Sequence, residues 1–322
     1  MNSMYALETK NLTRRYGKLT AVDNLNLQIP AGSLFGLIGP NGAGKTTTMR
    51  MLAGLLDPSE GEILLHGEST RSSGSRFRHE LGYMPDFFGV YEDMLVWEYL
   101  DFFARCYNTP SAQRDTLTSE LLDLVDLADK RDEYVEALSR GMRQRLCLAH
   151  ALVHDPKVLL LDEPASGLDP RARVEMRELL RELGSMGKTV IVSSHILAEL
   201  SELCDSVGII ERGQLVASGP INQITTQAQL HGQKQGKLLR IQTISEISST
   251  QELLSQMPNV MNAIENEGAI EIEFDGDAEA TAQLLAQIVN QGILVTSFGE
   301  VSSDLEDIFM RVTVGNQAEG EL

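Results

Sequence analysis

Residues 39–47 have the composition and spacing of a phosphate-binding loop. Their sequence, GPNGAGKTT, follows an apolar run and precedes a helical pattern that starts near Thr46. Glycines let the backbone curl so that successive N–H groups point inward, and the helix adds the partial positive charge of its N-terminus. A loop that served only packing would need neither the lysine nor the hydroxyl groups. The residues expected to hold the phosphates are Gly39, Asn41, Gly42, Gly44, Lys45, Thr46 and Thr47.

Two side chains of this loop have separate expected roles. Lys45 is expected to neutralise the β and γ phosphates, and Thr46 to offer its hydroxyl to Mg²⁺. The ion would bridge the β and γ oxygens and stabilise the charge that develops as the bond between them breaks. The loop therefore predicts nucleoside triphosphate chemistry.

Two adjacent carboxylates, Asp162 and Glu163, follow the apolar run at residues 158–161. Adjacent side chains of a strand point to opposite sides, so the two acids should have different tasks. Asp162 suits the metal shell, usually through water, whereas Glu163 can reach a water in line with the γ phosphate as general base or positioner. Capping of a helix by these acids is the alternative, and it is weaker beside a phosphate-binding loop.

A histidine, His195, ends another apolar run at residues 189–194. The carboxyl ends of parallel strands meet at one edge of a sheet, where ligands of α/β proteins bind, so His195 should lie near Glu163. A lone histidine is more often a hydrogen-bonded core residue than a catalyst. Its catalytic assignment therefore depends on the other motifs.

The segments that must position these residues alternate between apolar, branched runs and helical patterns. The runs are at residues 33–38, 158–161, 189–192 and 207–210. Such alternation predicts an α/β fold with a mostly parallel sheet that is covered on both faces. Strand signals vanish from about residue 86 to 140, with helices expected at 97–107 and 119–127, which indicates an inserted helical subdomain.

Composition argues against several classes of protein. No run of about 18 apolar residues occurs, and the N-terminus lacks the regions of a secretory signal, so neither a membrane span nor export is expected. Cys106, Cys147 and Cys204 lie in apolar surroundings without paired or metal-ligand spacing, which fits a reducing cytosol. The net charge of −19 repels phosphate backbones and weighs against a nucleic-acid partner.

The last third of the chain differs from the rest. Residues 226–322 carry 15 acidic and four basic residues, which accounts for more than half of the net charge. Strands are expected at residues 238–243, 260–266, 269–274 and 293–298, and helices at 251–256 and 278–289. The order β, α, β, β, α, β is that of a small ferredoxin-like domain.

Further motifs resemble those of ABC transporter ATPases. Residues 138–145, LSRGMRQR, resemble the signature motif, and residues 166–170, SGLDP, resemble the D-loop. His195 resembles the switch histidine and Tyr16 the aromatic residue that stacks on adenine. With the phosphate loop and the acid pair, these motifs follow the order of that family from about residue 8 to 220. The resemblance implies the ABC type of P-loop NTPase fold.

The resemblance also implies an ATPase that binds ATP and Mg²⁺ and works as a dimer. Ser139 and the backbone of Gly141 would contact the γ phosphate held by the loop of the opposite subunit, so one chain would hold half of each site. Opening and closing of the dimer would drive permease subunits on other chains, from the cytoplasmic side of the membrane. Capping of an ordinary helix by Ser139 is an alternative that is compatible with this role.

Residues 304–311, DLEDIFMR, are similar to the end of an extra C-terminal domain in bacterial ATPase subunits that pair with ABC-2 type permeases, mostly exporters. Such a domain could dimerise, regulate or sense a ligand, and the sequence does not decide among these. The expected organisation is an ATPase domain at residues 1–225 with its helical subdomain at about 86–140, a linker at 226–236, the ferredoxin-like domain at 237–314 and a polar tail at 315–322.

Three positions depart from the family pattern. Arg140 and Met142 replace glycine and glutamine of many members, and the family tolerates both changes. Asp86 replaces the usual Q-loop glutamine and brings a negative charge close to the triphosphate. We hypothesise that Asp86 keeps a catalytic, metal-binding role in which Mg²⁺ compensates its charge, although it could instead only cap its loop.

Nine of the 17 aromatic residues lie between Tyr83 and Tyr107, more than a small helical core requires. Phe87, Phe88 and Tyr91 are predicted to line a groove for a cytoplasmic helix of the permease, as in the family. They could instead form only an internal core.

Two other functions are compatible with the ATPase motifs. A nucleic-acid or ribosome-directed ABC ATPase usually has two cassettes or a long coiled coil between its Walker motifs, and neither occurs here. A regulatory or structural subunit with weak catalysis would not need the complete set of motif residues that this chain contains.

Overall fold

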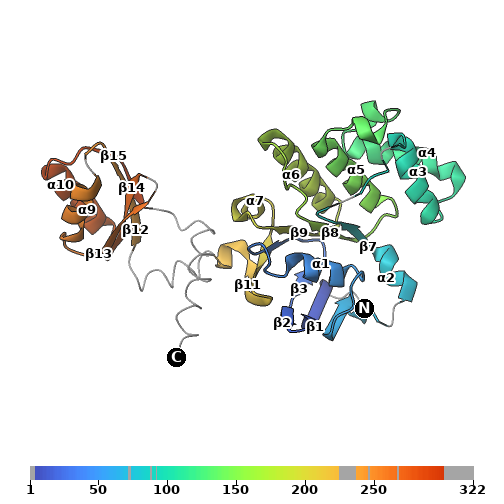
Figure 1. Cartoon of the computed structure of the whole chain (residues 1–322), viewed down its shortest axis with the longest axis horizontal. Helices are drawn as coiled ribbons and strands as arrows, with labels where there is room; N and C mark the ends of the chain where they lie inside the picture. The colour runs from blue at the N-terminus through green and yellow to red at the C-terminus, as the bar shows by residue number, and fades with distance from the viewer. Residues whose placement is uncertain are drawn as a thin grey trace. The chain divides into compact units, whose positions relative to one another are not determined.

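The computed structural model describes residues 4–300 except 72–73, 88, 92, 225–236, 246 and 267. The chain forms two compact units, Met1–Ile221 and Asn222–Leu322 (Figure 1). The predicted linker and tail and the motif at residues 304–311 lie outside the described residues, and the predicted domain boundaries stay predictions. No helix in the described part of the chain is long and apolar enough to cross a membrane.

A six-stranded sheet lies at the centre of the first unit, in the order β11-β10-β4-β9-β8-β7. Its neighbours are parallel except for the pair β10 and β11. Strands β4, β8 and β9 are buried along their whole length, as expected for a parallel sheet that is covered on both faces. The strands are β4 (Leu34–Ile38), β7 (Leu81–Met84), β8 (Val158–Asp162), β9 (Thr189–Ser194), β10 (Ser206–Glu211) and β11 (Gln214–Pro220). The predicted parallel sheet is therefore confirmed.

A second, antiparallel sheet lies on the far side of helix α1 (Lys45–Leu52) from the parallel sheet (Figure 1). In it, β1 pairs with β2, β3 and β5, and β5 pairs with β6. Its strands are β1 (Tyr5–Tyr16), β2 (Leu19–Leu25), β3 (Gln28–Pro30), β5 (Glu60–Leu65) and β6 (Glu68–Ser69). Apolar side chains of both sheets and of α1 form one core, for example Leu12, Phe35, Met49 and Leu160. The apolar runs of the sequence do not include these strands, in which buried and exposed residues are mixed.

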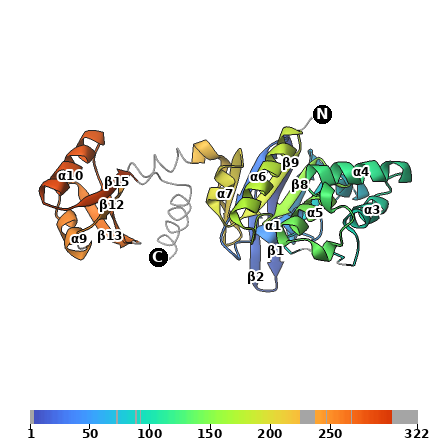
Figure 2. The same ribbon diagram turned by 90° about the horizontal axis from the view of Figure 1, so that it is seen from above.

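The remaining segments of the first unit are mostly helical. Helices α5, α6 and α7 lie on the side of the parallel sheet opposite α1 (Figure 1), and α6 lies over the sheet in the view from above (Figure 2). The helices are α2 (Gly74–Glu80), α3 (Val96–Cys106), α4 (Ser111–Leu124), α5 (Arg140–Leu152), α6 (Pro170–Ser185) and α7 (Leu197–Ser201), with short 3-10 turns at Ala128–Lys130 and Val135–Ala137. The prediction for α3 is accurate to one residue. Helix α4 begins earlier than expected, directly after Pro110, which the polar composition of its first turns concealed.

The second unit is a four-stranded antiparallel sheet with two helices. The strand order is β13-β14-β12-β15, and each pair of neighbours is antiparallel. Its elements are β12 (Lys237–Thr243), α9 (Ile247–Ser255), β13 (Val260–Asn266), β14 (Ala269–Phe274), α10 (Ala278–Asn290) and β15 (Val295–Glu300). Leu239, Ile241, Ile272 and Phe274 of the sheet pack with Leu284 of α10 in a separate core. This is the β, α, β, β, α, β order predicted for a ferredoxin-like domain.

The three cysteines are free thiols. Cys147 and Cys204 are buried, and burial raises the pKa of the Cys147 thiol to about 12. Cys106 is exposed at the end of α3, so the expectation of apolar surroundings is wrong for this residue. The last turn of α3 places this position away from the core, although Phe102, Phe103 and Tyr107 are close to it in the sequence.

Candidate nucleotide-binding and catalytic site

The phosphate-binding loop joins β4 to α1, and its glycines meet two different demands. Gly44 has φ +105°, a left-handed conformation, and a Cβ there would lie 2.5 Å from the carbonyl oxygen of Ala21. A Cβ on Gly39 would lie 2.3 Å from the carbonyl oxygen of Ile210. The loop therefore passes so close to β2 and β10 that only glycine fits at these positions.

Lys45 is the first residue of α1 and is only 5% exposed. Its Nζ donates to the carbonyl oxygen of Gly39 at 2.6 Å and lies 3.3 Å from that of Pro40. The ammonium group is thus folded back under the loop, where it is held by two backbone oxygens. This preorganisation lowers the entropy cost of ligand binding.

A cavity of about 490 Å³ opens above this loop. It brings together residues of β1, β2, the loop, α1 and the three segments that follow β7, β8 and β9. Its lining residues are Tyr16, Leu19, Ala21, Pro40, Asn41, Gly42, Gly44, Lys45, Thr46, Thr47, Asp86, Glu163, Ser166 and His195. Most of the residues predicted for the site therefore share one cavity.

Asp162 is the last residue of β8 and is fully buried. Its Oδ1 accepts a hydrogen bond from the hydroxyl of Ser193 at 2.6 Å, whereas Oδ2 has no hydrogen-bond partner in the described part of the chain. Burial raises the pKa of Asp162, the hydroxyls of Ser193 and Thr46 lower it, and the charges of Asp86 and Glu163 raise it. A buried carboxylate oxygen that lacks a partner, close to a hydroxyl and another acid, fits a cation site.

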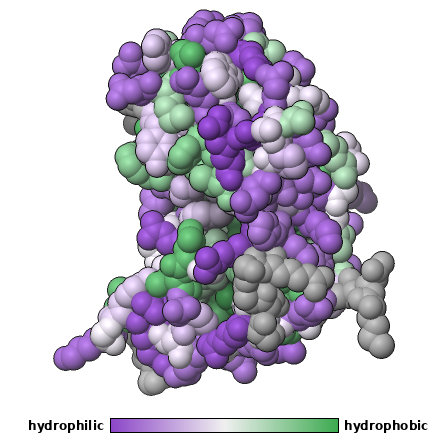
Figure 3. Space-filling model, turned by 90° about the vertical axis from the view of Figure 1, so that its right-hand side faces the viewer, coloured by the Kyte–Doolittle hydropathy of each residue, from purple (hydrophilic) through white to green (hydrophobic). Residues whose placement is uncertain are grey.

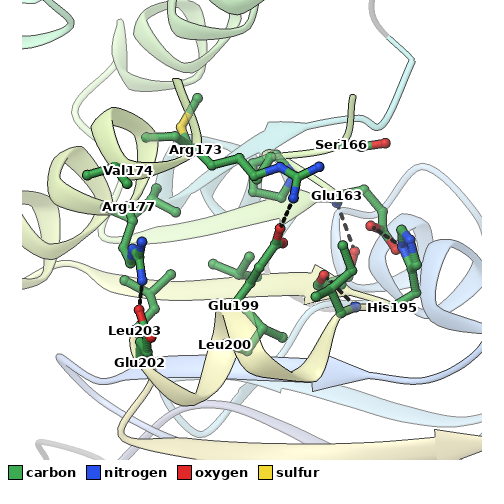
Figure 4. Close-up of a pocket in the computed structure, with 18 of the residues that line it drawn as sticks. Glu163, Ser166, Arg173, Val174, Arg177, His195, Glu199, Leu200, Glu202 and Leu203 are labelled. Atoms are coloured by element: carbon green, nitrogen blue, oxygen red, sulfur yellow. Dashed lines mark hydrogen bonds and ion pairs between the residues drawn. The ribbon is translucent and has the colours of Figure 1, made fainter. Parts of the chain in front are cut away.

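Glu163 lies between two basic groups. Its Oε1 is 3.3 Å from Nζ of Lys45, and its Oε2 is 2.9 Å from Nδ1 of His195 (Figure 4). The backbone at Glu163 is left-handed, with φ +50°, and its N–H donates to the hydroxyl of Ser193 at 3.0 Å. Such a conformation is costly for a side chain other than glycine and concentrates at functional sites. The Glu163 side chain is 11% exposed and that of His195 is 42% exposed, so Glu163 lies deeper in the cavity and His195 lies closer to solvent.

The residues assigned to Mg²⁺ are hard oxygen donors. Thr46 and Asp86 line the cavity, and Asp162 lies at the end of β8 close enough for the charge of Asp86 to raise its pKa. Among the described residues, no group of three or more His, Cys, Asp or Glu side chains could hold a metal by itself. The set therefore fits Mg²⁺ that takes its other ligands from phosphate oxygens and water.

Tyr16 ends β1 at the rim of the cavity and is 45% exposed. The guanidinium of Arg14 lies 4.7 Å from the centre of the Tyr16 ring, but Arg14 does not line the cavity. Tyr16 therefore presents to the cavity the surface that Arg14 leaves free. An aromatic surface at this position can stack on a purine.

The signature residues line a different cavity. Ser139 caps α5, and its hydroxyl accepts a hydrogen bond from the backbone N–H of Met142 at 3.3 Å. Ser139 and Gly141 line a cavity of about 350 Å³ together with Gly167 and Asp169 of the D-loop. Neither lines the cavity above the phosphate loop. Within one chain, the signature motif and the phosphate loop therefore do not share a cavity.

Arg140 contacts the D-loop, which the sequence did not suggest. Its Nη2 donates to the carbonyl oxygen of Ser166 at 3.0 Å, and Nε2 of Gln144 lies 3.2 Å from the same oxygen. Gly167 has φ +67°, and a Cβ there would lie 2.4 Å from Cζ of Arg140. The arginine that replaces a family glycine thus packs on a D-loop glycine.

The aromatic residues of the helical subdomain divide into a core set and an exposed set. Tyr99 is buried, and the ring of Phe103 stacks on His150 with centroids 3.6 Å apart. Phe87 and Tyr91 are exposed, at 89% and 55%, whereas Phe88 lies outside the described residues. Figure 3 shows hydrophobic patches among hydrophilic residues on the face of the first unit that carries α3 and α4.

Ser193 is a site residue that the sequence analysis missed. It holds both members of the acid pair, through the side chain of Asp162 and the backbone of Glu163. Its signal in the sequence was available, because a serine inside a fully buried strand needs a hydrogen-bond partner. The roles assigned to individual site residues stay predictions, although the structure gathers most of them in one place.

Two family models match separate parts of this chain. Residues 22–166 match the family model of the ABC transporter ATP-binding domain, described as "ABC transporter". Residues 229–313 match the model "ATP-binding protein DrrA1-3-like, C-terminal domain". The resemblance stated for the end of the chain is therefore supported by an independent family model.

Named relatives and solved structures agree with these matches. Nod factor export ATP-binding protein I of Ralstonia nicotianae is 41% identical over 220 residues, 68% of each chain. The probable multidrug ABC transporter ATP-binding protein YbhF of Escherichia coli is 37% identical over 222 residues, 69% of this chain and 38% of the relative. A solved ATP-binding subunit of an ABC transporter is 30% identical, with a TM-score of 0.63 over 70% of this chain and 95% of that one.

The first family model covers the phosphate loop and the acid pair, and the second covers residues 229–313. Proteins of this family bind ATP, hydrolyse it and act with transmembrane permease components. The chain belongs to the family of ABC transporter ATP-binding subunits and is an ATPase of the P-loop type.

Proposed function

We propose that this chain drives export by a separately encoded ABC-2 type permease, and that two copies bind ATP between them in a head-to-tail dimer. The observation that carries the proposal is the separation of the two motif cavities. Lys45, Glu163 and His195 meet in one cavity, whereas Ser139 and Gly141 line another. A nucleotide that contacts both sets must therefore bridge two chains.

Hydrolysis in this dimer would begin with a water in line with the γ phosphate. Glu163 accepts a proton from that water as its oxygen attacks phosphorus, and the bond to the β phosphate oxygen breaks to leave ADP. His195 holds the Glu163 carboxylate in place through its Nδ1, and Lys45 neutralises the phosphate oxygens. Mg²⁺, held by Thr46, Asp162 and Asp86, would stabilise the charge on the β and γ oxygens.

Three observations support a role in export at the cytoplasmic face of a membrane. Two relatives are named for the export of Nod factors and for multidrug transport. The second unit matches the C-terminal domain model of a DrrA-like ATP-binding protein. Exposed Phe87 and Tyr91 offer an apolar surface where a permease helix could dock.

The test compares wild-type protein with Glu163→Gln. Phosphate release should fall by at least about 100-fold, because the amide cannot accept the proton of the attacking water. Glu163→Gln with ATP should sediment as a dimer, while the protein without nucleotide should not. Equal hydrolysis by both proteins would contradict the assignment of Glu163, and an ATP-bound variant that stays a single chain, alone and with its permease, would contradict the shared site.

A further inference from the structure

We propose that Arg173 is a positioning residue for hydrolysis. Its side chain joins the D-loop to α7, the helix that follows His195. The proposal rests on the proposed roles of Glu163 and His195. Arg173 itself would touch neither ATP nor the attacking water. It would act by fixing the distance between two segments that flank the Glu163 carboxylate.

On one side, Arg173 holds the backbone of the D-loop. It lies in the first turn of α6. Asp169 caps the N-terminus of this helix, and its side chain accepts a hydrogen bond from the backbone N–H of Ala172 at 2.9 Å. Nε of Arg173 donates to the carbonyl oxygen of Leu168 at 3.1 Å. The D-loop is thus bonded at Leu168 by Arg173 and, at Ser166, by residues of α5.

On the other side, Arg173 pairs with α7. Its Nη1 lies 3.3 Å from Oε1 of Glu199, which is four residues after His195 (Figure 4). Glu163, His195, Arg173 and Glu199 all line one cavity of about 490 Å³ between α6 and α7. Because the guanidinium is planar and rigid, its two contacts couple the position of the D-loop to that of α7.

The charge of Arg173 also separates two carboxylates that could compete for one imidazole. Burial raises the pKa of Glu199. The charges of Arg173 and His195 lower it, that of Glu163 raises it, and that of Arg177 lowers it least. Glu199 is therefore within electrostatic range of both members of the Glu163–His195 pair. Without Arg173, Glu199 would lose its ion-pair partner, and its carboxylate could draw the His195 imidazole away from the hydrogen bond with Glu163.

The structure offers a matched control one turn further along the same helix. Arg177 of α6 forms an ion pair with Glu202, and both residues line the same cavity as Arg173 and Glu199 (Figure 4). Among the described residues, Arg177 makes no hydrogen bond to the D-loop. Loss of Arg177 should therefore remove a comparable ion pair without freeing the D-loop.

The experiment measures kcat and KM for ATP with the full-length chain carrying Arg173→Ala, Arg173→Lys or Arg177→Ala. Arg173→Ala should lower kcat about tenfold and leave KM within about twofold, since a small misplacement of catalytic groups costs turnover more than binding. Arg177→Ala should leave both within about twofold. Arg173→Lys, which keeps the charge but lacks Nε, should lower kcat about threefold and remains informative if the alanine variant does not fold.

Two results would overturn the positioning role. The first is an equal loss of kcat in Arg173→Ala and Arg177→Ala. The second is a wild-type kcat in Arg173→Lys together with a change in Arg173→Ala that affects KM and not kcat. Glu163→Gln, measured in the same assay, separates this failure from that of the proposed function. If Glu163→Gln is inactive while Arg173 and Arg177 variants behave alike, only the role of Arg173 is wrong.

Discussion

The two cavities that carry the family motifs differ in how their charged groups are paired. Above the phosphate loop, Lys45 and His195 both contact Glu163. In the signature cavity, the guanidinium of Arg140 bonds to a D-loop carbonyl, and the described residues place no carboxylate within ion-pair distance of it. The first cavity contains its own acid, base and phosphate-binding loop. The second offers the N-terminus of α5 and the guanidinium of Arg140, while its two acids are already engaged: Asp169 caps α6 and Glu175 pairs with Arg145 and Arg171. This difference is what the proposed site, shared between two chains, would require of its two halves.

The largest expected effect separates binding from assembly. Lys45→Ala should weaken ATP binding by about 100-fold, because it removes a buried charge from the phosphates. Ser139→Arg should leave ATP binding by one chain unchanged and prevent ATP-dependent dimerisation. A mixture of the two variants should regain hydrolysis, since one of the two sites in a mixed dimer then has an intact loop and an intact signature. Titration with fluorescent ATP and assays of phosphate release measure these outcomes. A mixture that remains as inactive as its components would contradict the proposal that the two cavities complement each other across two chains.

A second effect tests the floor of the first cavity. Ser193→Ala removes the hydroxyl that holds both Asp162 and the backbone of Glu163. We expect kcat to fall about tenfold, because buried polar groups lose their partner. Ser194→Ala is the matched control, since the hydroxyl of Ser194 accepts only from the backbone N–H of Ile196 among the hydrogen bonds described. Equal rates for both variants would show that the catalytic placement of Asp162 and Glu163 does not depend on Ser193.

A third effect concerns Asp86, which lines the first cavity only. Asp86→Ala should raise the Mg²⁺ concentration for half-maximal hydrolysis by about tenfold, as loss of a metal partner does. Asp86→Asn keeps an oxygen but not the charge, so its Mg²⁺ concentration for half-maximal hydrolysis should lie between those of the wild type and Asp86→Ala. A Mg²⁺ dependence identical to that of the wild type would refute the metal role and favour loop capping.

The smallest effect tests the rim of the first cavity. Tyr16→Ala should weaken ATP binding about fivefold, which corresponds to about 1 kcal/mol for an aromatic stack. Binding of tripolyphosphate, which lacks the base, should not change. Calorimetric titration with ATP and with tripolyphosphate measures the two affinities. An equal loss of affinity for both ligands would show that Tyr16 maintains the shape of the loop and does not contact the base.

Most of the fold could be predicted because its signals are local. Parallel strands such as β4 and β8 are continuous apolar runs, and β13 and β14 begin and end at the predicted residues. The antiparallel sheet was missed, since β1 mixes buried and exposed residues along 12 positions and contains no apolar run. The early start of α4 was missed for a related reason, because its first turns are polar.

The sequence by itself determined the chemistry: the phosphate loop, the acid pair, the histidine, the signature and the order of elements in the second unit. These depend on residue type and on spacing along the chain, which backbone geometry converts directly into position. Only the tertiary structure decided which segments meet, such as Ser193 with Asp162, Arg140 with Gly167 and Arg173 with Glu199. Those contacts join residues about 26 to 31 positions apart, and they arise from the pairing of strands and packing of helices, which no local pattern records.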